Sequence, residues 1–139
     1  MSGAIKKLRN ATIPVILIVS VSLGQTGEKH KPVPRLNKLD MKATDYQHVL
    51  GGSGESSTMR SGFVTLAPGK SVGRHNTETY EELIVVLEGR GTMVITGGDT
   101  LALELWDAAY CPSHTEHDVK NTGSDTLRYI YIVAKAEKE

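Results

Sequence analysis

The chain has 139 residues, which is enough for one domain built around a single hydrophobic core. Its 16 basic and 16 acidic residues balance, so the charge gives no electrostatic basis for binding nucleic acid or an anionic membrane surface. Cys111 is the only cysteine, which excludes an intramolecular disulfide bond.

Residues 1–24 have the three-part pattern of an export signal. A basic start is followed by a mostly apolar run at residues 11–23, which ends in small residues before Gln25. The run is shorter than the roughly 20 apolar residues that a transmembrane helix needs. We therefore predict a signal peptide cleaved before Gln25 and export to the bacterial periplasm or exterior, with no membrane attachment afterwards. A buried strand or an uncleaved anchor is the alternative.

Residues 25–59 are expected to form an N-terminal extension with an edge strand. Pro32 and Pro34 cannot donate to a central hydrogen-bond ladder, which keeps a strand in this segment at the edge of a sheet. The glycine- and serine-rich stretch at residues 51–57 is expected to be a loop. The barrel domain is therefore predicted to begin at residue 60 and to continue to residue 139.

Residues 60–139 contain short apolar segments separated by turn residues, a pattern typical of all-β domains. Glycine-containing turns join 82–87 to 92–96 and 92–96 to 100–105, which predicts two hairpins. No segment has the sustained 3.6-residue period of a long helix. A small antiparallel sandwich or barrel is predicted from strands at 62–66, 82–87, 92–96, 100–105, 108–111, 119–121 and 127–134.

Three side chains in this region have the chemistry of metal ligands: His75, Glu82 and His117. His75 and Glu82 flank a loop ahead of an expected strand, and His117 follows a proline turn at the start of another. Because side chains of a small barrel alternate between inside and outside, distant strands can bring such donors together at one barrel mouth. The arrangement therefore indicates a site for a divalent metal.

Two motifs in the chain resemble those of the cupin superfamily. The first has the form G-x5-H-x-H-x(3,4)-E-x6-G, and Thr77 stands at its second histidine, with matches at Gly69, His75, Glu82 and Gly89. The second has the form G-x5-P-x-G-x2-H-x3-N. Trp106 and His114 stand at its two glycines, with matches at Pro112, His117 and Asn121.

The resemblance implies a jelly-roll-like antiparallel β-barrel in which His75, Glu82 and His117 hold a divalent metal ion. Thr77 is expected to lie behind these ligands or to hold a water molecule, because a hydroxyl is a weaker donor than imidazole or carboxylate. Fe(II) is favoured because two histidines and one carboxylate leave positions open for substrate and dioxygen, although Mn, Ni, Co, Cu or Zn also accept these donors. The resemblance also implies a homodimer.

Other residues near the motifs are given structural roles. His114 is an alternative metal donor and otherwise an exposed turn residue, and Cys111 is expected to be a small buried residue near the barrel interior. Glu78 and Glu81 are expected to be solvated loop carboxylates. Four aromatic residues are expected to pack rather than to take part in chemistry: Tyr80, Trp106, Tyr129 and Tyr131.

The sequence leads to three functional hypotheses. The first is an exported metal-dependent enzyme that acts on a small organic molecule, as a dioxygenase or as an isomerase or lyase. No catalytic acid or base can be named for it from the sequence. The second hypothesis is a non-catalytic module that binds a small ligand, with or without metal. The third is a structural dimer with a vestigial metal site.

Overall fold

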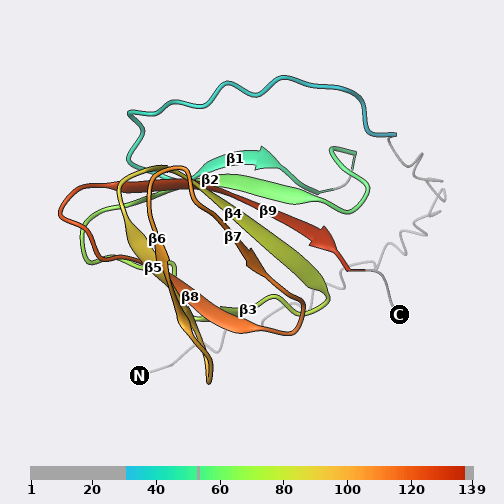
Figure 1. Ribbon diagram of the computed structural model, residues 1–139. Helices are drawn as coiled ribbons and strands as arrows, with labels where there is room; N and C mark the ends of the chain where they lie inside the picture. The colour runs from blue at the N-terminus through green and yellow to red at the C-terminus, as the bar shows by residue number, and fades with distance from the viewer. Residues whose placement is uncertain (1–30, 53, 137–139) are drawn as a thin grey trace, which may run out of the picture.

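The computed structural model describes residues 31–52 and 54–136, and this part of the chain contains nine β-strands (Figure 1). In chain order they are β1 (Gln47–Leu50), β2 (Arg60–Leu66), β3 (His75–Asn76), β4 (Tyr80–Glu88), β5 (Gly91–Ile95), β6 (Thr100–Leu103), β7 (Ala108–Cys111), β8 (Glu116–Asn121) and β9 (Leu127–Lys135). Each of the seven predicted segments overlaps one of these strands. The predicted export signal lies outside the described residues, none of which form a helix long and apolar enough to cross a membrane.

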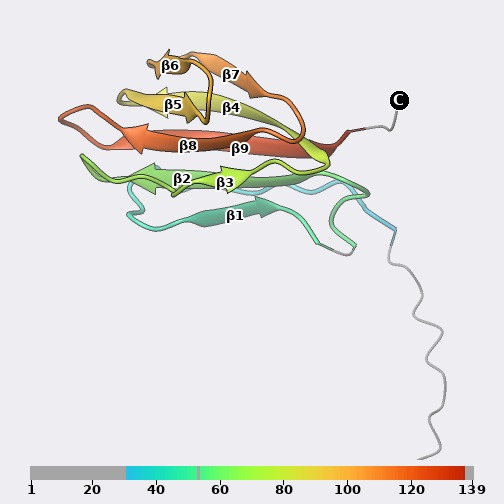
Figure 2. The ribbon, with the colours of Figure 1, turned by 90° about the horizontal axis from the view of Figure 1, so that it is seen from below.

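The strands form two sheets that run alongside each other (Figures 1 and 2). The larger sheet has five strands in the order β1-β2-β9-β4-β7, and the smaller has four in the order β3-β8-β5-β6. Every pairing between these strands is antiparallel. The all-β, antiparallel, jelly-roll-like barrel predicted from the sequence is therefore confirmed.

One of the two predicted hairpins is wrong. β5 and β6 pair as expected, but β4 pairs with β7 and β9 in the larger sheet while β5 pairs with β6 and β8 in the smaller one. The turn between β4 and β5 therefore carries the chain from one sheet to the other. Gly89 makes this possible because it has a φ of 74° and packs so closely on the Thr126 carbonyl oxygen that a Cβ would collide with it.

The inward-facing residues change from apolar to polar along the barrel. Register across β2, β9 and β4 aligns Val64, Tyr129 and Val86 in one row, and Arg60, Val133 and Glu82 in another. The first row lies in the hydrophobic core, whose members come from both sheets: Val64, Leu66, Ile84, Val86, Met93, Leu103, Ala109, Cys111, Val119, Leu127 and Tyr129. The second row places an exposed arginine and a buried carboxylate on the same face of the sheet.

Asn121 joins the two sheets at the apolar end of the barrel. Its side chain is completely buried, and its amide nitrogen donates to the carbonyl oxygens of Leu66 and Asp125, each at 2.8 Å. Its side-chain oxygen accepts a hydrogen bond from the Gly123 N–H at 2.9 Å. The end of β8 is thereby tied to the end of β2 and to the turn before β9, which explains why an amide is needed there.

Three exposed residues of the described part adopt the backbone conformation that favours glycine: Glu78, Trp106 and His114. Trp106 has a φ of 71° and His114 a φ of 58°, and both lie on turns ahead of strands that contribute to the interior. Trp106 and His114 are the two positions at which the second motif has glycine. Trp106 was expected to be a packing residue, but its side chain is 72% exposed and it does not pack in the core. The turn places it on the outside.

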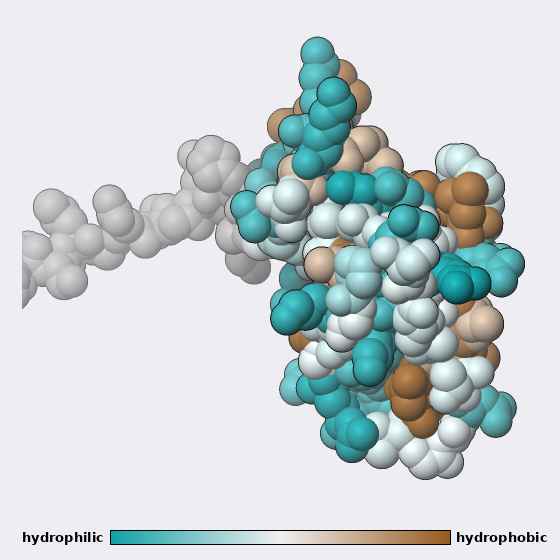
Figure 3. All heavy atoms as spheres, turned by 90° about the vertical axis from the view of Figure 1, so that its left-hand side faces the viewer, coloured by the Kyte–Doolittle hydropathy of each residue, from teal (hydrophilic) through white to brown (hydrophobic). Residues whose placement is uncertain are grey.

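The end of the barrel seen in Figure 3, which is the left-hand side of Figure 1, is mostly polar. Apolar side chains appear on it in small separate groups rather than as one patch. Contiguous exposed apolar patches mark interaction sites, so this face of the described residues carries no such signal.

Replacing Trp106 or His114, which have positive φ, by glycine is expected to stabilise the protein. Relief of a left-handed conformation is worth about 1–2 kcal/mol, and the added freedom of the unfolded chain costs about 0.5–1 kcal/mol. Trp106→Gly and His114→Gly should each raise the free energy of unfolding, measured in urea, by about 0.5–1 kcal/mol. Leu105→Gly is the control, because Leu105 is 51% exposed with an ordinary φ, and it should lower stability. Equal losses from all three changes would contradict the assignment of strain.

Candidate metal centre

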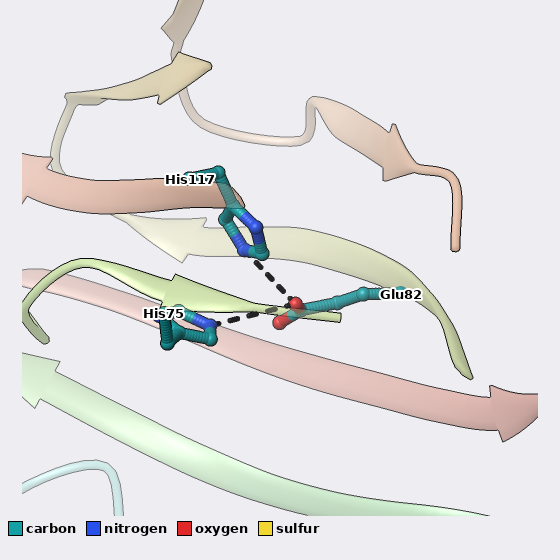
Figure 4. A group of neighbouring side chains, drawn as sticks. All are labelled: His75, Glu82 and His117. Atoms are coloured by element: carbon teal, nitrogen blue, oxygen red, sulfur yellow. Dashed lines mark ion pairs between the residues drawn. The ribbon is translucent and has the colours of Figure 1, made fainter. Parts of the chain in front are cut away.

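The three predicted metal ligands lie together inside the barrel (Figure 4). His75 comes from β3, His117 from β8 and Glu82 from β4. β3 and β8 are antiparallel neighbours in which His75 lies directly opposite His117. Glu82 reaches both imidazoles from the facing sheet. The site therefore depends on both sheets and forms only when the barrel is closed.

The donor atoms of the three side chains converge on one point. His117 Nε2 lies 3.0 Å from Glu82 Oε2, and His75 Nε2 lies 3.8 Å from the same oxygen. One donor atom of each residue lies within 4.8 Å of the other two. His117 and Glu82 are buried, whereas the His75 side chain is 44% exposed. The cluster is thus closed on the core side and open past His75.

Backbone carbonyl groups fix the orientation of both imidazoles. His75 Nδ1 lies 2.9 Å from the Gly73 carbonyl oxygen, and His117 Nδ1 lies 3.4 Å from the Thr115 carbonyl oxygen. A carbonyl oxygen can only accept a hydrogen bond, so each Nδ1 is the donor and carries the proton. The neutral rings therefore direct unprotonated Nε2 atoms towards Glu82, which is the arrangement of a metal-binding histidine.

His117 Nε2 is a buried nitrogen without a hydrogen-bond partner. Although it lies 3.0 Å from Glu82 Oε2, the contact lacks the alignment of a hydrogen bond. Burial disfavours the protonated ring, but the Glu82 carboxylate outweighs this effect and the pKa of His117 is raised. The pocket around Nε2 thus favours a positive charge.

The cluster fits a divalent metal ion. Two donors about 2.1 Å from a shared ion lie about 3–4 Å apart, and the two measured separations, 3.0 and 3.8 Å, fall in that range. Two neutral imidazoles and one carboxylate leave a buried negative charge, which is costly without a cation. The unpartnered Nε2 of His117 supplies a lone pair directed at the same point. Imidazole and carboxylate are donors that transition metals accept.

Thr77 stabilises, through hydrogen bonds, the turn at residues 112–115 that precedes His117. Its hydroxyl donates to the Pro112 carbonyl oxygen at 2.8 Å and accepts from the Thr115 N–H at 2.9 Å. Its own backbone N–H donates to the Thr115 carbonyl oxygen at 3.1 Å, the same oxygen that accepts from His117 Nδ1. Thr77 is 7% exposed, and these contacts use its hydroxyl as a structural link.

The remaining residues named from the sequence lie around the cluster. Cys111 is completely buried in the core, with its sulfur 3.4 Å from His117 Nδ1, and burial raises the pKa of its thiol. His114 is exposed on the turn and is not among the three clustered residues. Glu78 and Glu81 are exposed, and Glu81 accepts a hydrogen bond from the Tyr110 hydroxyl at 2.7 Å.

A cavity of about 430 Å³ adjoins the cluster and contains residues that the sequence interpretation missed. His75 and Glu82 line it, together with Arg60, Tyr46, Tyr80, Tyr129 and Tyr131. Three of these residues were expected only to pack: Tyr80, Tyr129 and Tyr131. The alternation of Tyr129 and Tyr131 with outward residues of β9 is the signal that could have placed them on the inner face. Arg60 shares the inward parity of Val64 on β2.

Comparison with known proteins identifies the family of the fold. The sequence pattern of the Cupin domain family matches residues 62–133. The oxalate-binding protein of Thermotoga maritima is 31% identical over 68 residues, which are 49% of this chain and 55% of that protein. The chain thus spans about half the length of this relative. A crystal structure of a predicted oxalate decarboxylase from Thermotoga maritima has a TM-score of 0.52 at 26% identity, over 55% of this chain and 65% of that one.

Other solved structures match more of the fold at lower identity. A Bacillus halodurans protein has a TM-score of 0.63 at 17% identity, covering 79% of this chain and 89% of its own. A Cupin 2 conserved barrel domain protein from Salinispora arenicola has a TM-score of 0.61 at 19% identity, covering 75% of this chain and 91% of its own. Since the family match over residues 62–133 includes the strands that carry Glu82 and His117, this chain belongs to the cupin family.

Proposed function

We propose that the chain holds a divalent metal ion through His75, Glu82 and His117 and acts on a small organic molecule in the adjoining cavity. The proposal rests on the orientation of both histidines. Each donates a hydrogen bond from Nδ1 to a backbone carbonyl oxygen and directs Nε2 towards the buried Glu82 carboxylate. This is an arrangement for binding a cation rather than for neutral packing.

The metal would supply Lewis acidity or activate dioxygen, and two histidines with one carboxylate favour Fe(II) over Mn, Ni, Co, Cu or Zn. Glu82 would lower the charge of the metal centre and hold the ion in the barrel, while His117 would hold it from the buried side. His75 borders the cavity, so a small molecule reaches the centre past this residue. Closed apolar walls around the core side exclude water from His117.

Thr77 is proposed to stand where the first cupin motif has its second histidine. Its hydroxyl is engaged by the backbone at Pro112 and Thr115, which supports a role in positioning and leaves three protein donors. A three-donor centre has more open positions than one with four donors, and this favours a dioxygenase, isomerase or lyase over a purely structural metal site.

Binding without turnover is a second candidate function. The relative in Thermotoga maritima is named an oxalate-binding protein, and the cavity suits a ligand of small size. The two candidates are separated by incubating metal-loaded protein with small organic acids and following dioxygen uptake and the amount of acid. Loss of acid supports an enzyme, whereas stable acid with measurable binding supports the binding module.

We also propose that the protein is exported and forms a homodimer. Export is supported by the signal-like residues 1–24, and the mass of protein recovered from the source cell should correspond to a chain that begins at Gln25.

A homodimer is supported by the outer face of β4 and β7, where Leu83 and Tyr110 lie opposite each other and are 38% and 52% exposed. Light scattering that gives a monomer mass would contradict the dimer.

Removal of a ligand should abolish metal binding, whereas removal of the Thr77 hydroxyl should not. We expect His117→Ala and Glu82→Gln to lose the bound metal in elemental analysis of untagged protein. Thr77→Val should keep the metal but lower the free energy of unfolding by about 1–3 kcal/mol, because it leaves buried backbone groups unpaired. His114→Ala, which removes an exposed histidine, is the matched control. Equal metal loss in Thr77→Val and His117→Ala would make Thr77 a ligand.

Metal binding should weaken as the pH falls. A metal ion must compete with protons for both Nε2 atoms, and the raised pKa of His117 makes protons stronger competitors than at an ordinary histidine. Calorimetric titration between about pH 8 and pH 5.5 should therefore show affinity that declines already near neutral pH, by up to about tenfold per pH unit for each protonated histidine. An affinity that is constant over this range would argue against histidine ligands.

A further inference from the structure

The cavity beside the proposed metal centre contains an arginine whose charge is not paired. Arg60 lines the cavity at its solvent-exposed side, and among the described residues no carboxylate lies within ion-pair distance of its guanidinium. The acidic side chains that line the same cavity are Glu78, which is exposed, and Glu82, which faces the two histidines. An unpaired guanidinium at a cavity wall is a ready partner for an anion.

The fold holds this guanidinium close to the metal centre. Arg60 on β2 and Glu82 on β4 lie in the same inward row, with Val133 of β9 between them. The guanidinium carbon lies 4.4 Å from the centroid of the Tyr80 ring, a cation–π contact. Tyr80 is two residues before Glu82 on the same face of β4, about 7 Å along the strand. A short molecule can therefore contact both places.

A pair of phenols borders the same space. The Tyr46 and Tyr131 hydroxyl oxygens lie 3.0 Å apart, and both side chains line the cavity. One proton lies between the two oxygens, so the second hydroxyl proton is available to a ligand. Gly62 makes room for this arrangement, since a Cβ there would collide with the Tyr46 ring. The segment before β1 thus contributes a donor to the cavity.

The charges in the cavity make anion binding dependent on the metal. Without a metal, Arg60 is outweighed by the carboxylates of Glu78 and Glu82. A bound divalent ion reverses the sign, because it adds two positive charges beside Glu82. A ligand with a carboxylate is then attracted from both ends, by the metal at one end and by Arg60 at the other.

We propose that Arg60, with the Tyr46–Tyr131 phenol pair, forms a carboxylate subsite, and that the ligand is a short dicarboxylic acid that bridges this subsite and the metal. The inference rests on the proposed metal-dependent function and adds the class of ligand. Tyr80, which the guanidinium covers, lies about 7 Å from Glu82 along β4, and this spacing favours a ligand with a chain of a few carbon atoms. A neutral amide of the same shape lacks the charge that Arg60 binds.

The test measures metal binding and acid binding separately. Untagged protein is first titrated with Mn(II) alone, and the loaded protein is then titrated with malonate or with malonamide, its neutral analogue. We expect malonate to bind and malonamide to bind at least about tenfold more weakly. Arg60→Gln should keep the Mn(II) stoichiometry and weaken malonate binding by about tenfold or more, because a charged hydrogen-bonding partner is lost.

Two further variants show whether the effect is specific. Arg90→Gln changes the net charge equally at an exposed residue outside this cavity, and it should leave malonate affinity unchanged. Tyr131→Phe removes one phenol and should weaken malonate binding by about two- to tenfold, with Mn(II) binding intact. An equal loss in Arg60→Gln and Arg90→Gln would overturn the subsite and indicate only a general charge effect.

The outcomes separate this inference from the proposed function. Mn(II) binding with malonate affinity that is unchanged in Arg60→Gln would overturn the subsite and leave the metal centre standing. Preference for malonamide over malonate would overturn the ligand class. No Mn(II), Fe(II) or Zn(II) binding by the unmodified protein would overturn the proposed function, and the bridging ligand with it. Thermal unfolding of each variant confirms that lost binding is not lost folding.

Discussion

The rest of the site depends on the contact between the buried Glu82 carboxylate and the imidazoles of His75 and His117. The carboxylate places a negative charge inside a β-barrel, where an unpaired ion costs several kcal/mol. The two imidazoles that face it come from the opposite sheet, and each is turned by a backbone carbonyl at its far nitrogen. The charge is therefore compensated only when both sheets are in register, which links formation of the site to closure of the barrel.

The sequence contained enough information for the fold class but not for the connections between sheets. The alternating and β-branched segments at β2 and β4 to β9 have a clear strand pattern, because one face of each is packed on the core. A glycine turn is compatible with a hairpin and with a crossing between sheets, so the turn at Gly89 did not distinguish them. β3 has two residues, too few for any periodic pattern.

Site residues at characteristic spacings in the sequence could be predicted. Residues that only the fold brings to the site could not. His75, Glu82 and His117 lie at motif positions, so their convergence could be inferred before any coordinates. Arg60 and Tyr46 have no motif around them and meet in the cavity only because β1 and β2 flank the same end of the sheet. Trp106 was expected to be a packing residue, but it has a left-handed backbone conformation and its side chain is exposed, which no spacing in the sequence indicated.

The position of β9 has a consequence for how the chain folds. This strand is the last of the nine in the described residues, yet it is the middle strand of the five-stranded sheet, between β2 and β4. Neither partner can complete its ladder during synthesis until β9 has left the ribosome. Such long-range pairing has a large loop-closure cost and slows folding. The nascent chain therefore keeps open strand edges until β9 has emerged, and removing β9 would divide the sheet rather than trim it.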